Sequence, residues 1–316
     1  MALSETAKEL FSSLDVHNLK LRRPLPFIFL CGGPLTPPPG EAKSVREQFL
    51  RQGGSRSYFR SEAGIVLAEH VDQAFADRQF DDLLELEKYV ATLSEVVVLI
   101  VEAPGAIAEL GAFSQIPEIA ERLFVVVRSG LHPRRSFISL GPLRSLERRE
   151  SPVSVYAWAD FDGDKIQMPP DVMAELINDV SYEINNRPKH EKYSDKKLSH
   201  FMLLMAQIIY LARCASTAEI KEALNILGVS IGGRDVGLCL TAMSIVGWVR
   251  QEQERRHKYW VVNDAFKPSE YAYRPDVPND TLRWVSDISE EYKATNDPKY
   301  HLFTRLFTEK ARALVA

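Results

Sequence analysis

Cysteine is scarce in this sequence, and that scarcity argues against two common ways of holding a chain together. The 316 residues include three cysteines, Cys31, Cys214 and Cys239. They are odd in number, far apart along the chain and in no spacing typical of a zinc site. The sequence therefore predicts neither a disulfide framework nor a bound metal.

Long apolar runs and an excess of basic charge are missing as well. The longest apolar stretch without charge is far too short to span a bilayer. The first residues, MALSETAKELF, are polar and amphipathic, unlike those of a signal peptide. The formal net charge is −4, so nucleic-acid binding would have to come from a local basic patch. We expect a cytoplasmic protein that has no membrane partner.

The order of apolar runs in the first half of the chain predicts a parallel α/β sheet. Short segments rich in apolar residues alternate with segments of helical spacing, which is typical of a parallel sheet covered on both faces. In such sheets ligands bind at the carboxyl ends of the strands. The predicted strands occupy residues 26–33, 64–67, 95–102, 122–129 and 152–161.

After about residue 170 the pattern becomes mostly helical. Ser216 precedes Glu219 by the three-residue spacing of a capping box. The sequence predicts three helices here: one over residues 198–212, one that starts after Ser216 and one that starts at Gly233. They are followed by GWVRQEQERRHKYWVVN, which predicts two short strands joined by a charged turn. Three helices and a hairpin in this order are typical of a winged helix-turn-helix domain. We therefore predict a catalytic α/β domain over 1–168, a connecting helix and linker over 169–197, and a winged-helix domain with a helical extension over 198–316.

The stretch VVVLIVEAPGAIAELGAFSQI, residues 96–116, holds a carboxylate that core packing does not require. Six apolar residues lead to a break at Pro104-Gly105, and a helix of small residues follows with one acid, Glu109. This carboxylate either stabilises the helix start through the dipole or does chemistry at the ligand edge of the sheet. A glutamate there could attack, or electrostatically stabilise, the oxocarbenium-like carbon of a ribose whose base is leaving.

Further candidates surround the same edge. The CGG loop either lets backbone N–H groups approach a phosphate or base, or forms a tight turn, and it matches no common nucleotide-binding motif. We interpret Cys31 as a small buried residue rather than a nucleophile. Glu87 is either a solvated helix charge or a group that orients a ribose hydroxyl or the base. The predicted substrate-binding set is Cys31, Gly32, Gly33, Glu87, Glu102, Pro104 and Gly105.

Two basic clusters could contact nucleic acid, one around RRSFISLGPLRSLERR and one at the predicted hairpin turn. Each is either solvated surface or a set of phosphate contacts. The predicted recognition helix offers mainly Arg234, Thr241 and Ser244, which is little for reading bases. We expect backbone or shape binding, or a protein contact. The predicted nucleic-acid-binding residues are Arg134, Arg135, Arg255, Arg256 and Lys258.

The segments FIFLCGG, LLELEKYVATLSEVVVLIVEAPGAIAELGAFS and RRSFISLGPLRSL together resemble the effector protein of one class of bacterial retrons. Such effectors carry an N-terminal nucleoside deoxyribosyltransferase-like domain and a C-terminal winged-helix domain. The resemblance is strong over about residues 25–150 and covers 195–265 in architecture alone. Its most specific block is E-x-P-G-x-x-x-E-L-G-A-F-S, residues 102–114.

The resemblance implies a Rossmann-like parallel sheet of the nucleoside deoxyribosyltransferase type, followed by a mostly helical winged helix-turn-helix domain. It implies an anti-phage toxin that cleaves the N-glycosidic bond of a nucleotide. NAD is the leading candidate, as a substrate rather than a cofactor, and no cofactor is expected. Glu109 takes the place of the nucleophile, and the CGG loop that of the base- or phosphate-binding loop.

The resemblance also implies partners. Family members associate with a reverse transcriptase and its branched multicopy single-stranded DNA (msDNA), with its noncoding RNA (ncRNA), which hold the toxin in check. Whether the chain forms a homo-oligomer is left open by the sequence.

Two other functions stay open. One is a nucleotide-sensing, DNA-binding transcriptional regulator without turnover. The other is a salvage deoxyribosyltransferase that exchanges bases between deoxynucleosides. Many deoxyribosyltransferases have an aspartate shortly before the nucleophile, whereas this chain has Ala103-Pro104-Gly105-Ala106 there. That difference argues against base exchange, while hydrolysis needs only water as the acceptor.

Overall fold

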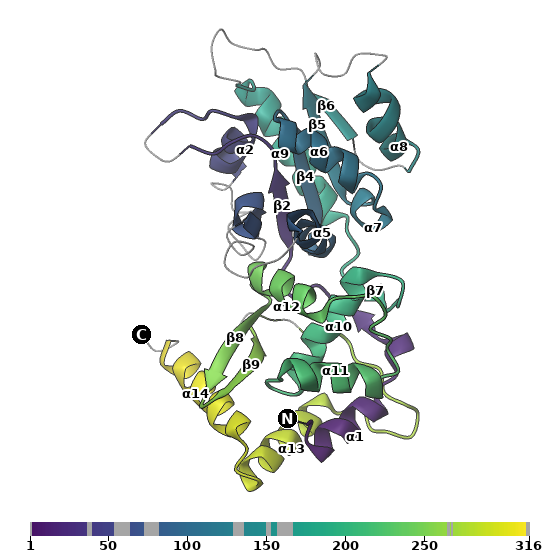
Figure 1. Cartoon of the computed structure of the whole chain (residues 1–316), viewed down its shortest axis with the longest axis vertical. Helices are drawn as coiled ribbons and strands as arrows, with labels where there is room; N and C mark the ends of the chain where they lie inside the picture. The colour runs from purple at the N-terminus through teal and green to yellow at the C-terminus, as the bar shows by residue number, and fades with distance from the viewer. Residues whose placement is uncertain are drawn as a thin grey trace. The chain divides into compact units, whose positions relative to one another are not determined.

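The computed structural model divides the chain into two compact units (Figure 1). One unit is continuous and comprises Pro26–Arg187, and the other combines Met1–Leu25 with Pro188–Ala316. The structure describes residues 2–36, 40–53, 64–72, 82–128, 136–149, 153–156, 167–263, 266 and 268–313.

The continuous unit is built on a five-stranded sheet in which every neighbouring pair is parallel. Counted along the chain, the strand order across the sheet is second, first, third, fourth, fifth, which is a doubly wound topology. The prediction of a parallel α/β sheet is confirmed. In spatial order the strands are β3 (Gly64–Leu67), β2 (Phe27–Cys31), β4 (Val96–Val101), β5 (Leu123–Arg128) and β6 (Val153–Tyr156).

Helices cover this sheet because its central strands are apolar on both faces. All residues of β2 and β4 are buried. On one face, Ile28, Val98 and Phe124 share a core with α2 (Val45–Gly53) and α9 (Pro170–Asn185). Successive residues of a strand point to opposite faces, so the remaining apolar side chains need a second layer. In Figure 1 the helices labelled α5 and α6 lie in front of the sheet.

Further helices of this unit are α5 (Leu83–Leu93), α6 (Pro104–Phe113), α7 (Pro117–Ala120) and α8 (Arg144–Glu147). The segment η3 (Ser139–Leu143) is a π-helical stretch that leads directly into α8.

The predicted boundary after residue 168 differs from the observed units because α9 is part of the sheet unit. Met173, Leu176, Ile177 and Val180 all lie in the core beneath the sheet. Their spacing is that of one helix face. Residues 170–185 are therefore a packed layer rather than a connecting helix.

The first 25 residues also depart from the predicted 1–168 domain, since they belong with the C-terminal half. The Glu291 carboxylate accepts hydrogen bonds from the backbone N–H groups of Glu5 and Thr6, each at 3.0 Å, at the start of α1 (Glu5–Ser13). After η1 (Val16–Asn18), strand β1 (Lys20–Leu21) pairs with β7 (Glu191–Lys192). Capping by a distant carboxylate and strand pairing hold this segment in the second unit.

The second unit has the predicted order of three helices followed by a hairpin. The predicted capping box is confirmed: the Ser216 hydroxyl and the Glu219 carboxylate each accept a backbone N–H from the other residue. Glu219 also forms a fully buried ion pair with Lys299 at 2.6 Å, which the sequence did not predict. The elements are α10 (Leu198–Leu211), α11 (Thr217–Ile226), α12 (Val236–Ile245), β8 (Val249–Glu254), β9 (His257–Val262), α13 (Thr281–Ala294) and α14 (Pro298–Ala313).

Helix α10 is apolar on nearly all sides because it forms the centre of this unit, where all but two of its 14 residues are buried. In the part of the chain that the structure describes, no helix is both long enough and apolar enough to cross a membrane.

Candidate functional site

The candidate site lies where the strand order of the sheet reverses. Strands β2 and β4 are neighbours, and the sheet grows outward from them in opposite directions. Loops leaving two such strands separate and open a crevice at their carboxyl ends, where doubly wound folds bind ligands. The two loops are Gly32-Gly33, after Cys31, and Glu102-Ala103, after Val101. The two loops meet, because the Glu102 carboxylate accepts a hydrogen bond from the Gly33 backbone N–H.

Glu102 is the residue that joins the two loops. One carboxylate oxygen accepts hydrogen bonds from the backbone N–H groups of Gly33 at 3.0 Å and Arg46 at 2.9 Å. The other accepts from Val45 N–H at 2.8 Å, at the start of α2. Burial raises the pKa of Glu102, although these hydrogen bonds act in the opposite direction. With both oxygens engaged, Glu102 positions the loop and caps α2.

The two glycines of the CGG loop are required by close packing. Gly32 has φ +154°, and a Cβ there would lie 3.0 Å from Arg46 Cβ and 3.1 Å from the Ile100 carbonyl oxygen. A Cβ on Gly33 would lie 2.8 Å from both the Glu102 carboxyl group and Ser44 Cβ. The loop therefore lacks side chains because it packs against Glu102 and α2.

We expect Gly33→Ala to lower the free energy of unfolding by about 1–3 kcal/mol, the usual cost of overpacking. The matched control is Gly105→Ala in α6, where a Cβ would meet nothing within 4 Å and alanine favours the helix. Urea unfolding followed by circular dichroism measures both. Equal stability of the two variants would show that Gly33 tolerates a side chain and that the close packing is not a constraint.

Arg46 also supports the loop, a role that the sequence did not predict. Arg46 is 2% exposed. Its side chain donates a hydrogen bond to the Gly33 carbonyl oxygen at 3.1 Å and forms a bidentate ion pair with the Glu69 carboxylate. Its Nε is buried and has no hydrogen-bond partner among the described residues. The helical spacing could have predicted the burial of Arg46, since this residue lies on the same buried face of α2 as Phe49 and Gly53.

Glu109 projects from α6 beside the end of β2. Its Oε2 atom is buried and has no hydrogen-bond partner in the described part of the chain. Burial raises the pKa of Glu109, while the Arg46 charge and a hydrogen bond from the Cys31 thiol lower it. Gly105 and Ala112, one turn before and after it, carry little side chain, so a ligand could approach this carboxylate closely.

Glu87 is buried, which overturns its interpretation as a solvated helix charge. It lies on α5 and is 7% exposed. Burial, followed by repulsion from Glu109, Asp72 and Glu69, raises its pKa to about 8. Glu87 is therefore mostly protonated at neutral pH.

Cys31 is buried in the same site. Burial and the charges of Glu109 and Glu87 raise the pKa of its thiol well above the usual range. A thiol that stays protonated is a poor nucleophile, in agreement with its interpretation as a small buried residue.

The remaining predicted substrate-binding residues, Pro104 and Gly105, are exposed at the start of α6. The N-cap residue, Ala103, has no side chain that could cap the helix. The N-cap side chain therefore does not compete for the backbone N–H groups at this end of α6, and N–H groups at a helix start can bind an anion. Among the described residues, no group of three or more His, Cys, Asp or Glu side chains could hold a metal ion.

The predicted nucleic-acid contacts lie in the other unit or outside the described residues. Arg255 and Arg256 form the exposed two-residue turn between β8 and β9, and Lys258 follows, also exposed. Thr241, assigned to the predicted recognition helix, is 3% exposed and unavailable to a base. Arg134 and Arg135 fall outside the described residues.

This chain is similar to one protein family and to two curated proteins. A family model described as STM3845 retron effector protein matches residues 42–251, more than half of the chain. The Escherichia coli protein named "Retron Ec86 putative ribosyltransferase/DNA-binding protein" is 32% identical over 127 residues, 39% of this chain and 38% of that protein. The similarly named Retron Ec73 protein of Escherichia coli is 27% identical over 149 residues, 45% of each chain. The aligned regions span less than half the length of these curated relatives. The family match shows that this chain belongs to the retron effector family.

Proposed function

We propose that this chain is the toxin effector of a retron anti-phage system and that it hydrolyses the N-glycosidic bond of a nucleotide. NAD is the leading candidate for the substrate. The observation that carries the proposal is the Glu109 carboxylate, which lies at the strand-order reversal of the sheet and whose Oε2 has no hydrogen-bond partner among the residues that the structure describes. The names of the two Escherichia coli relatives, which include ribosyltransferase, favour chemistry at a ribose carbon.

The proposed reaction has two steps. The Glu109 oxygen forms a bond to the ribose C1′ as the bond from C1′ to nicotinamide breaks, and nicotinamide leaves with that electron pair as a neutral molecule. Water then attacks C1′, gives ADP-ribose, releases a proton and frees the carboxylate. The open start of α6 would hold the pyrophosphate, and Glu102 and Arg46 would keep the loop in place.

The proposal also assigns a role to the second unit. Three helices and a hairpin with an exposed basic turn support a winged-helix assignment. We propose that a retron reverse transcriptase with its msDNA and ncRNA binds the chain and restrains the toxin. The turn residues Arg255 and Arg256, with Lys258 on β9, are the contacts to phosphate that this assignment favours.

Base release tests the proposal directly. The purified chain, with and without its reverse transcriptase–msDNA partner, is incubated with NAD, purine nucleotides or pairs of deoxynucleosides, and products are separated by chromatography. We expect nicotinamide and ADP-ribose from NAD, and less of both with the partner present. Base exchange between deoxynucleosides would instead support the salvage transferase. No release from folded protein in either state would support the nucleotide-sensing regulator.

A further inference from the structure

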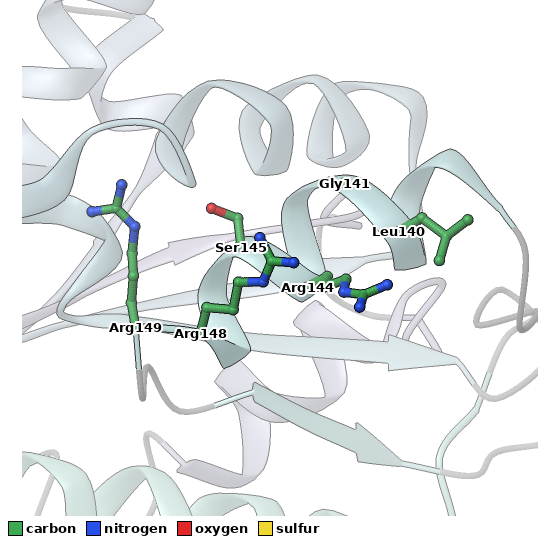
Figure 2. Close-up of a pocket in the computed structure, with 6 residues that line it drawn as sticks. All are labelled: Leu140, Gly141, Arg144, Ser145, Arg148 and Arg149. Carbon is green, nitrogen blue, oxygen red and sulfur yellow. The ribbon is translucent and has the colours of Figure 1, made fainter.

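A cavity of about 490 Å³ lies beside the helical segment formed by η3 and α8 (Figure 2). It belongs to the α/β unit, and no residue of the Glu109 site lines it. Its lining residues are Leu140, Gly141, Arg144, Ser145, Arg148 and Arg149. Figure 2 shows the three arginines spread along the segment, with the Ser145 hydroxyl and the Arg148 guanidinium between those of Arg149 and Arg144.

The cavity concentrates positive charge in a chain whose net charge is −4. Arg144, Arg148 and Arg149 are all exposed. Within the part of the chain that the structure describes, none of them forms an ion pair, whereas the exposed Arg283 pairs with Asp287. Glu147 is the single acid among residues 144–149, so this stretch carries a net charge of +2 from three arginines and one glutamate. Guanidinium groups left unpaired together favour a ligand with several negative charges.

An exposed aromatic ring lies next to one of the residues that line this cavity. Phe137 is 86% exposed. Its ring lies against Gly141, a lining residue, where a Cβ would be 3.7 Å from the nearest ring atom. Leu140, also in the lining, is 51% exposed. Exposed aromatic and aliphatic side chains beside unpaired arginines offer a ligand both stacking and charge neutralisation.

We propose that this cavity is a binding site for single-stranded nucleic acid. Arginines spread along a helical segment suit successive phosphates of a backbone better than one phosphate of a free nucleotide. Phe137 would stack on an unpaired base, which a duplex keeps inside its helix. This site is independent of the proposed glycosidase chemistry and of the basic turn in the other unit.

The test measures fluorescence anisotropy of a labelled single-stranded oligothymidylate with the full-length chain over a range of salt concentrations. For Arg144→Gln/Arg148→Gln we expect the slope of log affinity against log salt to become shallower by about 1.4, because two phosphate contacts are lost. For Phe137→Ala we expect affinity to fall about fivefold or more with the slope unchanged, because stacking is not a charge effect.

The matched control is Arg283→Gln/Lys293→Gln on α13, which removes the same charge from exposed side chains. It should bind as the wild type does, and circular dichroism should show every variant folded. Unchanged binding by the cavity variants would overturn the proposal, and so would loss confined to Arg256→Gln/Lys258→Gln at the β8–β9 turn. Equal affinity for a duplex would also overturn it.

Discussion

Glu109→Gln is expected to reduce base release on the order of a thousandfold or more, because it removes the oxygen proposed to bond to C1′. Glutamine keeps the size of the side chain and cannot carry the negative charge. The free energy of unfolding should stay equal or rise, since the variant no longer holds an ionisable carboxyl whose Oε2 is buried without a hydrogen-bond partner among the described residues. Chromatography of released base and urea unfolding measure the two effects separately.

Glu121→Gln provides the matched control, since the same substitution there changes an exposed side chain that follows α7. It should release base at the wild-type rate. Full activity in folded Glu109→Gln would exclude this carboxylate as the reacting group and leave the site without a nucleophile. A variant that is inactive because it is unfolded would be recognised by its circular dichroism spectrum.

Glu87→Gln is expected to stabilise the protein, and more so at pH 8 than at pH 5. The pKa of Glu87 is about 8 in the folded chain, against an ordinary value of 4.5. Between these values the unfolded chain releases a proton that the folded chain keeps, so the free energy of unfolding falls as pH rises. Below about 4.5 both states are protonated, and above about 8 both are ionised. The variant removes a penalty on the order of 4 kcal/mol at pH 8 and above.

Urea unfolding at a series of pH values measures this change. Glu85→Gln is the control, because Glu85 lies two residues away on the same helix and is exposed. It should leave both the stability and its pH dependence nearly unchanged. If wild type and Glu87→Gln lose stability in parallel from pH 5 to pH 8, then Glu87 ionises normally and other groups cause the slope.

The main layout of the α/β unit followed from the sequence because its signals are local. Entirely apolar runs such as VVVLIV predict buried parallel strands, and glycines after β2 with Pro104 after β4 mark the loops at their carboxyl ends. The strand-to-helix connection then places Glu109 at the ligand edge. The capping box at Ser216 is equally local, and it too was confirmed.

The rest of the site depends on which helix faces pack inward, and spacing alone did not settle that. Glu87 and Arg46 each lie on a helix with charged residues on several sides, yet each is almost completely buried. Their burial comes from neighbours distant in sequence, such as Glu69 beside Arg46. The role of Glu102 was missed for a similar reason, since its partners Gly33, Val45 and Arg46 lie 56–69 residues earlier.

The union of residues 1–25 with the C-terminal half has a consequence for synthesis on the ribosome. The carboxylate that caps α1, Glu291, is translated 286 residues after Glu5, so the first helix emerges long before its partners exist. The α/β unit, continuous over Pro26–Arg187, can complete its sheet in the meantime. During each round of translation the Glu109 site could therefore form before the unit proposed to receive the restraining partner, which would favour making that partner first or alongside.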